Sequence, residues 1–590
     1  MESKPPKPFR LALPRIESRR VKGKSHLRDR RIHDWEDIEA ILDELVARDL
    51  PGPTKSFSDG IAFVTFAYDI DGVSIEIAKY GACLEHLFDP PPTIHCIGGN
   101  FGWKADSVLP EPWKRRTLQG ADGWGKWEGG KWFDRLFREE MPAGSEASEE
   151  LACEIWSRAI ALADDLERYI ASEEIGLLMV VNVNSNPGNL AFALATVLAS
   201  EWTGCPVLNN NHDFYWEGGK PASERSPGEE PGPRDHFFRN RGNESFFRLF
   251  KRLLPWNGRR WIQVNINPTQ SQSLIQEQGF DPSDVDNVGT LVEESFFRPC
   301  TQEEKREHRL RMAHILSDGE PRIRPVAVQD FLAGASDWMG DQRPVLCGAE
   351  PGLELDIASS DALYLLQPTR VVARKRIERD WELVGALLEH PPFREAFETR
   401  PALTLTLHIS GPVPIEHQTD LERVLGAYRE VLGRLPDSIG RRLFLAFSVG
   451  TEDHPALHDN GLGRIAMAGI YKLADAVLFP SLTEGRGLPI PESSAAGVPI
   501  VCSRYQPEEV FATVVGEQLP AEQRIRYDLF PEGKFGADLL ESVTRILLDP
   551  ASLAERIQHN REVVRQRYAM PEMNRSFQRY LERLRVKSAA

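Results

Sequence analysis

The feature that most constrains the fold is an alternation of apolar runs and amphipathic segments that starts twice along the chain. Residues 61–68 form an apolar run typical of a buried strand, and a segment with apolar residues at helical spacing follows it. A second series of such runs covers residues 362–367, 402–410, 442–448, 476–480 and 499–502. Short strands that alternate with helices predict parallel sheets covered by helices. We therefore predict an α/β chain with two doubly wound, Rossmann-like parallel-sheet domains that face each other across a cleft.

The length of 590 residues exceeds what one hydrophobic core usually supports, which agrees with a division into domains. We expect an N-terminal domain over residues 56–300 and a C-terminal domain over 346–550, joined by a connecting segment at 301–345. Residues 1–55 are expected to form a basic arm and a short helix. The Trp- and Gly-rich segment 101–135 has no clear periodicity and gives no prediction of structure or role.

The formal net charge of −17 disfavours nucleic-acid binding, because the phosphate backbone would be repelled. Residues 1–31 depart from this average with 11 Lys and Arg against three acidic residues. Two interpretations of this arm stay open. It is either a solvated, disordered segment or one that makes weak contact with an anionic surface.

The seven cysteines are widely spaced and include no Cys-x-x-Cys pair, so the sequence signals neither a zinc site nor a disulfide framework. No uninterrupted apolar stretch reaches the roughly 18 residues of a membrane span, and the N-terminus lacks the apolar run of a signal peptide. These patterns predict a cytoplasmic location with reduced thiols.

Residues 474–502, ADAVLFPSLTEGRGLPIPESSAAGVPIVC, carry the chemistry. A strand is followed by a loop with Gly485 and Gly487, whose lack of side chains lets backbone amides approach a ligand. The helix expected to begin near Pro491 turns its N-terminus toward the same space, which favours an anion such as pyrophosphate. Ligands of open α/β sheets bind at this carboxyl edge.

Two carboxylates, Glu484 and Glu492, bracket the loop. A carboxylate accepts hydrogen bonds from neighbouring hydroxyls, which suits a ribose or a hexose. Taken alone, such a pair also fits a loop residue and a helix-start residue on an ordinary surface.

The whole segment resembles the signature of retaining glycosyltransferases of the GT-B architecture, in particular family 4, which approximates ADxxxxPSxxEGFGLPxxEAxAxGxPVV. The residues in register are Ala474, Asp475, Pro480, Ser481, Glu484, Gly485, Gly487, Leu488, Pro489, Glu492, Ala495, Gly497 and Pro499. The resemblance implies that Glu484 contacts the donor sugar and Glu492 the nucleotide ribose. It also implies that the amides around Gly487 and Leu488 hold the sugar or the diphosphate. Arg486 stands where the family commonly has Phe.

Residues 365–375, LLQPTRVVARK, resemble the family's GRLxxxKG element through Arg370 and Lys375. In the family these two cations neutralise the leaving diphosphate, and breaking the glycosidic bond does release negative charge that must be stabilised. Thr369 and Arg376 replace the two glycines of the element, which predicts a stiffer loop.

Two glycines are placed at the donor site by the same resemblance. Residues 406–411 resemble the family's strand that ends in a glycine near the nucleotide, which places Gly411 there. Residues 447–450 correspond to the segment against which the nucleotide base packs in the family. Gly72 follows the first strand and resembles the glycine of a loop whose amide faces the donor phosphate or the acceptor. The last helices, over residues 551–590, resemble the terminal pair that crosses back to the first domain.

Residues 211–217 resemble the histidine-containing loop of some family 4 members. His212 is the candidate to hydrogen-bond the transferring sugar or the acceptor hydroxyl, because imidazole can donate or accept. Asp213, Tyr215 and Trp216 are weaker candidates on the acceptor side. The alternatives are a capping His–Asp pair and aromatic rings that belong to the core.

The predicted activity is transfer of a hexose from a UDP- or GDP-sugar to a hydroxyl acceptor, with retention of configuration and with no metal or other cofactor. The catalytic residues implied are Glu484, Arg370, Lys375 and His212. Two alternatives stay open: a related phosphorylase or epimerase, and a catalytically silent nucleotide-sugar-binding or scaffold protein. The sugar, the base, the acceptor and the oligomeric state are not determined by the sequence.

Overall fold

The computed structural model describes residues 30–589 except 48–54, 70, 103–104, 138, 218–237, 321–322, 414–416 and 450–453. Most of the basic arm therefore lies outside the described residues. The chain divides into two compact units, residues 1–289 with 573–590 and residues 290–572. The segment 301–345, predicted as a connection, belongs to the second unit. The α/β class with parallel sheets is confirmed, and the cleft between the sheets stays a prediction.

The first unit contains a seven-stranded sheet of order β5-β3-β1-β6-β7-β8-β9, in which neighbouring strands pair in parallel. The strands are β1 (Gly60–Val64), β3 (Thr93–Gly98), β5 (Lys114–Thr117), β6 (Leu177–Val181), β7 (Val207–Asn211), β8 (Trp261–Asn265) and β9 (Val285–Asn287). The predicted single strand 61–68 is wrong in its second half. There the chain leaves the large sheet after Val64, and β2 (Ala67–Tyr68) pairs with β4 (Asn100–Phe101) instead.

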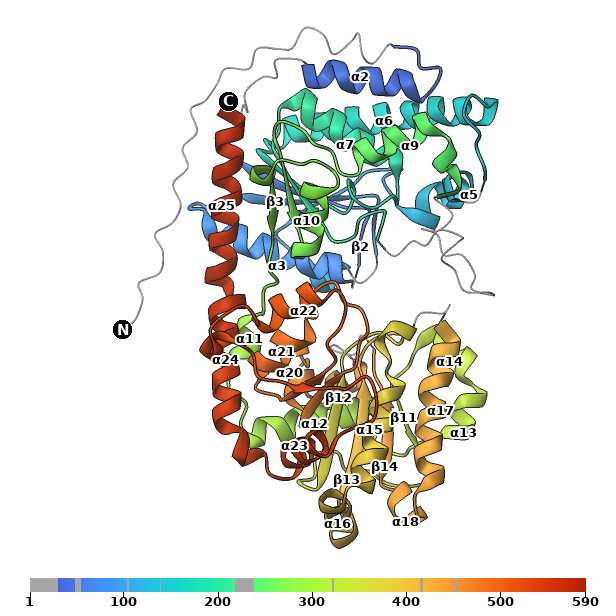
Figure 1. Ribbon diagram of the computed structural model, residues 1–590, viewed down its shortest axis with the longest axis vertical. Helices are drawn as coiled ribbons and strands as arrows, with labels where there is room; N and C mark the ends of the chain where they lie inside the picture. Colours follow the sequence, from blue (N-terminus) through green and yellow to red (C-terminus); the bar gives the residue numbers. More distant parts are fainter. Residues whose placement is uncertain are drawn as a thin grey trace. The chain divides into compact units, whose positions relative to one another are not determined.

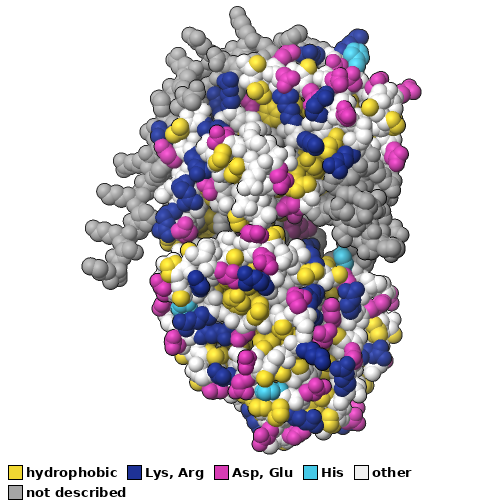
Figure 2. Space-filling view, viewed as in Figure 1, with side chains coloured by type: hydrophobic (Ala, Val, Ile, Leu, Met, Phe, Trp, Pro, Cys, Tyr) yellow, Lys and Arg dark blue, Asp and Glu magenta, His cyan; other side chains and the backbone are white. Residues whose placement is uncertain are grey.

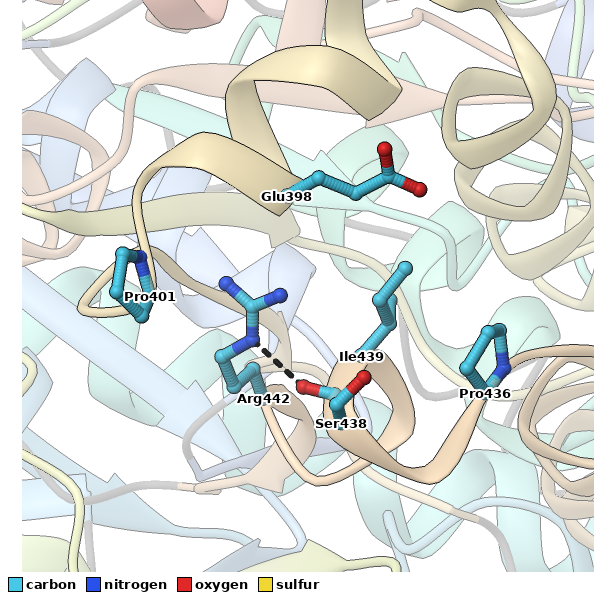
Figure 3. Close-up of a pocket in the computed structure, with 6 residues that line it drawn as sticks. All are labelled: Glu398, Pro401, Pro436, Ser438, Ile439 and Arg442. Carbon is cyan, nitrogen blue, oxygen red and sulfur yellow. Dashed lines mark hydrogen bonds between the residues drawn. The ribbon is translucent and has the colours of Figure 1, made fainter.

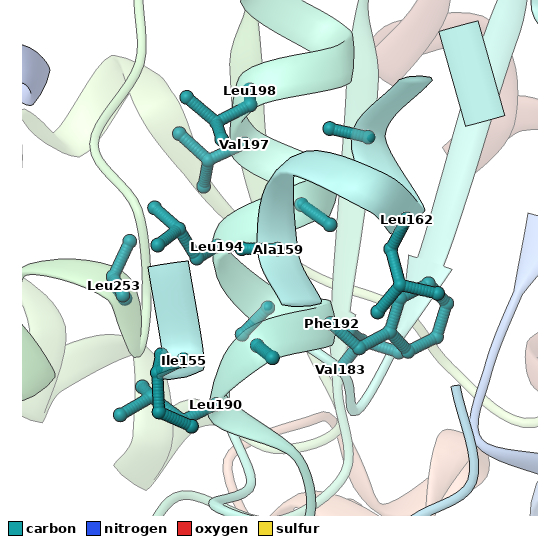
Figure 4. Close-up of a cluster of buried hydrophobic side chains, with 14 of the residues drawn as sticks. Ile155, Ala159, Leu162, Val183, Leu190, Phe192, Leu194, Val197, Leu198 and Leu253 are labelled. Carbon is teal, nitrogen blue, oxygen red and sulfur yellow. The ribbon is translucent and has the colours of Figure 1, made fainter. Parts of the chain in front are cut away.

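Helices cover both faces of this sheet (Figure 1). The helices α2 (Trp35–Ala47), α6 (Glu146–Ser172), α7 (Leu190–Thr203) and α9 (Glu244–Leu253) lie on one side, and α3 (Gly72–Leu87) lies on the other. Figure 4 shows Ile155, Ala159 and Leu162 of α6 facing the apolar residues of α7. α7 is buried along all of its length except its last residue, Thr203, which explains its apolar sequence. The remaining helices are α4 (Ala105–Val108), α5 (Lys131–Phe137), α10 (Pro268–Gln276) and the 3₁₀ segments Trp124–Gly130, Phe238–Gly242 and Pro282–Asp284.

The last helix, α25 (Met570–Ala589), packs mainly within the first unit. Its Tyr580 hydroxyl donates to the carbonyl of Asn287, and Arg583 pairs with Asp286 at 2.9 Å. α24 (Ala554–Tyr568) belongs to the second unit, so the chain returns to the first unit only in α25, from residue 573 onward.

The second unit contains an eight-stranded sheet of order β10-β11-β14-β13-β12-β15-β16-β17. The strands are β10 (Val326–Ala327), β11 (Val345–Gly348), β12 (Ala362–Gln367), β13 (Thr404–Ile409), β14 (Leu443–Phe447), β15 (Ala476–Phe479), β16 (Ile500–Cys502) and β17 (Asp528–Leu529). All neighbouring pairs are parallel except β11 with β14. Alternate residues of β12 enter two different apolar clusters, so this strand is buried on both faces, as expected for a doubly wound sheet.

The helices of the second unit lie before, between and after its strands, singly or in consecutive pairs. They are α11 (Glu294–Phe297), α12 (Gln302–Leu316), α13 (Val328–Ala333), α14 (Ala335–Asp341), α15 (Glu378–Glu389), α16 (Pro391–Thr399), α17 (Gln418–Arg434), α18 (Asp437–Gly440), α19 (Pro455–Asp459), α20 (Met467–Lys472), α21 (Pro489–Ala496), α22 (Glu508–Val515) and α23 (Ala537–Leu548). On the face shown in Figure 2, acidic and basic side chains are interspersed over both units. Among the described residues, no helix is long and apolar enough to cross a membrane.

Asp475, directly before β15, links this strand to α12. Its carboxylate accepts hydrogen bonds from Lys305 at 2.6 Å, Arg309 at 2.8 Å and the amide of Tyr364 at 2.7 Å. Burial alone would raise the pKa of Asp475, but the two cations and the amide outweigh burial and hold the pKa below 3.8. The Asp of the family-like motif therefore has a structural contact network in this chain.

We expect Asp475→Asn to lower the free energy of unfolding by about 2–3 kcal/mol at pH 7, because it removes the charge that pairs with the buried Arg309. A carboxylate with a lowered folded-state pKa stabilises the fold above the unfolded-state pKa, and this stability is lost as the pH falls through the folded-state pKa. The variant should therefore differ most from wild type near neutral pH and least in acid. Urea unfolding at several pH values measures this, with Asp337→Asn on the exposed face of α14 as the control. Equal effects of the two substitutions would contradict the structural role of Asp475.

Candidate active site

The predicted site lies at the point in the second sheet where the strand order reverses. The chain runs from β12 through β13 to β14 on one side, and then places β15 against the other side of β12. The loops that leave the carboxyl ends of β12 and β15 are therefore neighbours, although about a hundred residues separate them. Open α/β sheets bind ligands at this kind of reversal, because the two loops diverge there and leave a crevice.

The two predicted loops meet through an ion pair. Lys375, at the end of the 3₁₀ turn Ala373–Lys375, pairs through Nζ with Oε1 of Glu484. Lys375 is 6% exposed and Glu484 is 8% exposed. The backbones are joined as well, because the amide of Leu482 donates to the carbonyl of Arg374 at 2.8 Å. The structure thus brings together two residues that the sequence assigned to one site from separate motifs.

Burial and the charge of Glu484 act in opposite directions on the pKa of Lys375. Burial lowers its pKa, the carboxylate of Glu484 raises it, and the charges of Arg374 and Arg370 lower it again, so the pKa lies below its ordinary value of 10.5. Arg374 donates to the carbonyl of Thr483 at 2.6 Å. The ammonium group is therefore held among other cations at a place where an added anion would be stabilised.

Arg370 lies in the same loop after β12, and its side chain is exposed. Within the described part of the chain, its side chain forms no hydrogen bond or ion pair. A guanidinium without a protein partner next to a buried lysine is available for a phosphate, with which it forms paired hydrogen bonds.

Gly411, which follows β13, supports the loop of Arg370. A Cβ atom at this position would lie 2.1 Å from the carbonyl oxygen of Thr369 and 2.5 Å from the amide nitrogen of Arg370. The amide of Val371 donates to the carbonyl of Pro412 at 2.9 Å, so the two loops run side by side. The requirement for glycine therefore comes from close backbone packing in this chain, and a contact with nucleotide stays a prediction.

We expect Gly411→Ala to destabilise the protein by about 1–3 kcal/mol, because backbone atoms must move to admit the methyl group. The displaced backbone belongs to Thr369 and Arg370, so the affinity for nucleotide diphosphate should fall as well. Thermal unfolding with and without UDP or GDP measures both effects. Gly426→Ala in α17 is the control, since nothing lies within 4 Å of a Cβ atom there. A variant with wild-type midpoints in both titrations would show that the loop tolerates the change.

The start of α21 supplies backbone donors next to this pair. Gly487 has φ +60°, and a Cβ atom there would lie 2.1 Å from the hydroxyl of Tyr505, so both the backbone conformation and the packing require glycine. Pro489 and Pro491 have no N–H, and the amide of Ile490 donates to the carbonyl of Gly487. Among the described contacts, the amides of Gly487 and Leu488 donate to no protein group. These two amides are therefore the donors that the helix start can offer to an anion.

The helix begins at Pro489, two residues before the predicted start at Pro491. Glu492 consequently lies in the first turn, where Tyr471 of α20 donates to its Oε2 at 2.7 Å. Gly485 is exposed in the loop before the helix. Glu492 and Glu484 are thus held from opposite ends of one loop, by a tyrosine and by a lysine.

Gly72 of the first unit begins α3, and a Cβ atom at this position would meet nothing within 4 Å. The preceding residue, Asp71, caps the helix by accepting the amide hydrogen of Ser74 at 2.7 Å. Burial raises the pKa of Asp71, against the hydrogen bonds that lower it. Because a carboxylate already occupies this helix start, the place suits a hydroxyl better than a phosphate.

His212 follows β7 and is held by three side chains, none of which the sequence analysis singled out. Asn182 accepts hydrogen bonds from the amides of His212 and Asp213 at 2.9 and 3.2 Å. Gln270 donates to the carbonyl of His212 at 3.0 Å, and Asn210 contacts its imidazole Nε2 at 2.8 Å. No helix begins within residues 212–217, the part of this loop that the structure describes, and the alternative of a capping His–Asp pair stays open.

The aromatic residues of this loop belong to packing. Tyr215 is 5% exposed and packs edge-on against Phe250 at 5.2 Å between ring centroids. Trp216 is half-buried and stacks on Phe214 at 4.3 Å, and Asp213 is half-buried. The core interpretation therefore fits Tyr215 better than a sugar-stacking role. The sequence analysis missed Asn182 and Asn210. A signal for them is that asparagines stand at or near the ends of buried strands, where apolar residues are usual.

A separate cavity of about 280 Å³ lies at the opposite edge of the second sheet (Figure 3). It is lined by residues that precede β13 and β14, including Pro401 and Arg442, and Arg442 donates to the carbonyl of Ser438 at 2.9 Å. In the described residues no group of three or more His, Cys, Asp or Glu side chains could hold a metal ion.

Comparison with known proteins gives the following relatives. No family model matches the chain. The mannosylglucosylglycerate synthase of Petrotoga mobilis is 20% identical over 450 residues, which are 74% of this chain and 80% of that protein. The structure of Anabaena HepE with UDP and glucose has a TM-score of 0.49 and 11% identity, covering 89% of this chain and 99% of that one. Sucrose-phosphate synthase from Thermosynechococcus elongatus has a TM-score of 0.49 and 15% identity, with 90% and 99% covered. The curated relative confirms the resemblance to glycosyltransferases that residues 474–502 indicate.

Proposed function

We propose that the chain is a retaining glycosyltransferase that moves a hexose from a UDP- or GDP-linked donor to a hydroxyl acceptor. The observation that carries the proposal is the buried Lys375–Glu484 pair, with Arg370 exposed beside it at the reversal of strand order. A sugar diphosphate needs cations for its phosphates and carboxylates for its hydroxyls, and this loop pair offers both.

The donor diphosphate binds to the Arg370 guanidinium and to the amides of Gly487 and Leu488. When the bond between the anomeric carbon and the phosphate oxygen breaks, negative charge grows on the departing diphosphate. Arg370 and Lys375 stabilise that charge, and fixed cations cost no reorganisation at the moment of reaction. We propose that these side chains take the place that a metal ion has in other transferases.

Glu484 accepts hydrogen bonds from the transferring sugar, and Glu492 accepts them from the ribose. Glu484 also keeps Lys375 charged and in place, because a buried ammonium group without a counter-ion tends to lose its proton. His212 of the first unit contacts a hydroxyl of the transferring sugar or of the acceptor.

Retention follows from attack on the face that the phosphate leaves. The acceptor oxygen forms a bond to the anomeric carbon, the carbon–phosphate oxygen bond breaks, and the acceptor proton passes to the departing phosphate oxygen. The sugar is oxocarbenium-like at the transition state, and no enzyme carboxylate forms a covalent bond to it. The acceptor classes are a polyol, a saccharide, a lipid head group or a glycerate, and the name of the Petrotoga relative makes glycerate glycosides an early choice for assay.

The test combines binding and turnover with the purified full chain. UDP, GDP and their hexose conjugates are first ranked by the rise in thermal midpoint, because a ligand that binds the folded state alone adds about 2.7 kcal/mol at a hundredfold excess over Kd. The donor that binds is then incubated with acceptors in the presence of EDTA, and NMR determines the anomeric configuration of the product. Retention with EDTA present is the expected result. Inversion, or activity that EDTA abolishes, overturns the mechanism, and binding without turnover under any condition favours the catalytically silent alternative.

A further inference from the structure

The first unit carries a chain of buried amide side chains at the carboxyl ends of β6, β7 and β8. On one face of the sheet, Asn209 and Asn211 share the Oε1 atom of Gln263, with N–O distances of 2.9 and 3.2 Å. On the other face of β7, between these two residues, Asn210 is fully buried and turns toward His212. Amides in the interior of strands are costly to bury, so each needs a role that compensates for desolvation.

The orientation of the Asn210 amide is fixed by its other neighbour. Its Nδ2 donates to the backbone carbonyl of Val264 at 3.0 Å, and a carbonyl oxygen can only accept. The NH₂ group of Asn210 must therefore face Val264, which leaves its Oδ1 facing the Nε2 atom of His212 at 2.8 Å. An oxygen acceptor at this distance requires a hydrogen on Nε2.

We infer that Asn210 is a positioning residue that holds His212 in the Nε2–H tautomer. The neutral ring then has its lone pair on Nδ1, and that nitrogen can only accept a hydrogen bond. Which ring nitrogen carries the proton is commonly set by the bond that the other nitrogen makes. This inference rests on the proposed function for its consequence: His212 receives a hydrogen bond from a substrate hydroxyl and does not donate one.

The backbone of His212 is also held in place, which fixes the position of its ring relative to Asn210. Asn182 adopts φ +63°, a conformation that asparagine tolerates, and its Oδ1 accepts from the amides of His212 and Asp213. Gln270 of α10 holds the carbonyl of His212 from the other side. The amide, the carbonyl and the ring of His212 are thus each held by a different side chain, which lies in the turn after β6, in α10 and in β7 respectively. A histidine on an ordinary surface does not need such an arrangement.

The experiment reads the tautomer directly by long-range ¹H–¹⁵N NMR of the full chain labelled at histidine, at a pH where the ring is neutral. The signals of His212 are assigned by their absence in His212→Gln. In the wild-type protein Nε2 is expected to be the protonated nitrogen. Asn210→Asp and Asn210→Leu form a matched pair, because both lose the donor to Val264 and only the aspartate keeps an acceptor for Nε2.

We expect Nε2 to stay protonated in Asn210→Asp and the preference to be lost in Asn210→Leu. Turnover should fall about tenfold in the leucine variant, the equivalent of one hydrogen bond, and should be partly restored in the aspartate variant. A wild-type ring protonated at Nδ1, or an unchanged tautomer in Asn210→Leu, overturns the inference. The wild-type spectrum decides the question even when a variant fails to fold. Because the tautomer is measured without substrate, an inactive protein with the Nε2–H ring contradicts the proposed function and leaves the inference standing.

Discussion

Replacing Arg370 by alanine is expected to lower kcat by about 10²- to 10³-fold, the usual loss when one preorganised stabiliser of transition-state charge is removed. Arg370 is exposed and forms no ion pair within the described residues, so its removal leaves no buried charge behind. The free energy of unfolding should therefore stay within about 0.5 kcal/mol of wild type. Steady-state kinetics with the donor identified by thermal shift, together with urea unfolding, measure the two quantities.

The control for this variant is Arg394→Ala on α16, whose side chain is partly exposed and pairs with Glu398 at 2.8 Å. It changes the net charge by the same amount but lies before β13, away from the carboxyl edge of the sheet. Near-wild-type kcat for Arg370→Ala, or equal losses in the two variants, would show that Arg370 does not act on the departing diphosphate. A rise in the donor KM without a change in kcat would assign Arg370 to ground-state binding alone.

Arg370→Lys refines the interpretation of this loss. Lysine keeps the charge but not the planar fork that forms two parallel hydrogen bonds to a phosphate. Recovery of most of the activity would indicate that charge alone is needed, whereas little recovery would indicate paired hydrogen bonds. Either result can be compared directly with the alanine variant, because the position is exposed in all three.

Much of the second unit could be predicted from sequence because its signals are local. Residues 476–479 are an unbroken apolar run, and the glycines and prolines after them punctuate a loop and a helix start. The pairing of Glu484 with Lys375 is not local, because it depends on which strands are neighbours. The resemblance to a known motif supplied that information, and the order β13-β12-β15 gives its physical reason.

The support of His212 could not be predicted, because it depends on three side chains brought together by the first sheet. Asn182 directly follows β6, Asn210 lies within β7 one residue before its end, and Gln270 lies on the helix that follows β8. Asparagines near the ends of apolar runs are visible in the sequence, but their spacing along the chain does not show which of them contact His212. The single strand expected over residues 61–68 failed for a similar reason: apolar character continues past Val64, but the hydrogen-bond partner changes from the large sheet to β4.

The Lys375–Glu484 pair allows stability and catalysis to be separated. Lys375→Met should reduce the free energy of unfolding by about 3–5 kcal/mol, because Glu484 is then buried and, among the described residues, has only the weaker ion pair with Arg374 at 3.8 Å. Glu484→Gln should also destabilise the protein, since it leaves a buried ammonium group. The double variant Lys375→Met/Glu484→Gln has neither charge, and replacing a buried pair by neutral groups of similar size is often close to neutral. Its unfolding free energy should therefore return to within about 1 kcal/mol of wild type.

Activity should not return with stability. The double variant lacks both the cation proposed to stabilise the departing phosphate and the carboxylate proposed to accept the sugar hydroxyls, so kcat should stay at least about 10²-fold below wild type. Urea unfolding of the four proteins gives the coupling energy, and single-turnover kinetics give the chemical step. If the double variant were as unstable as the sum of the single losses, the two charges would not be coupled in the folded protein. If the double variant were stable and active, the Lys375–Glu484 pair would serve only packing. Other groups would then have to stabilise the negative charge on the departing diphosphate. A stable and inactive double variant is the outcome expected when the pair is kept for chemistry, because the fold tolerates its removal and the reaction does not.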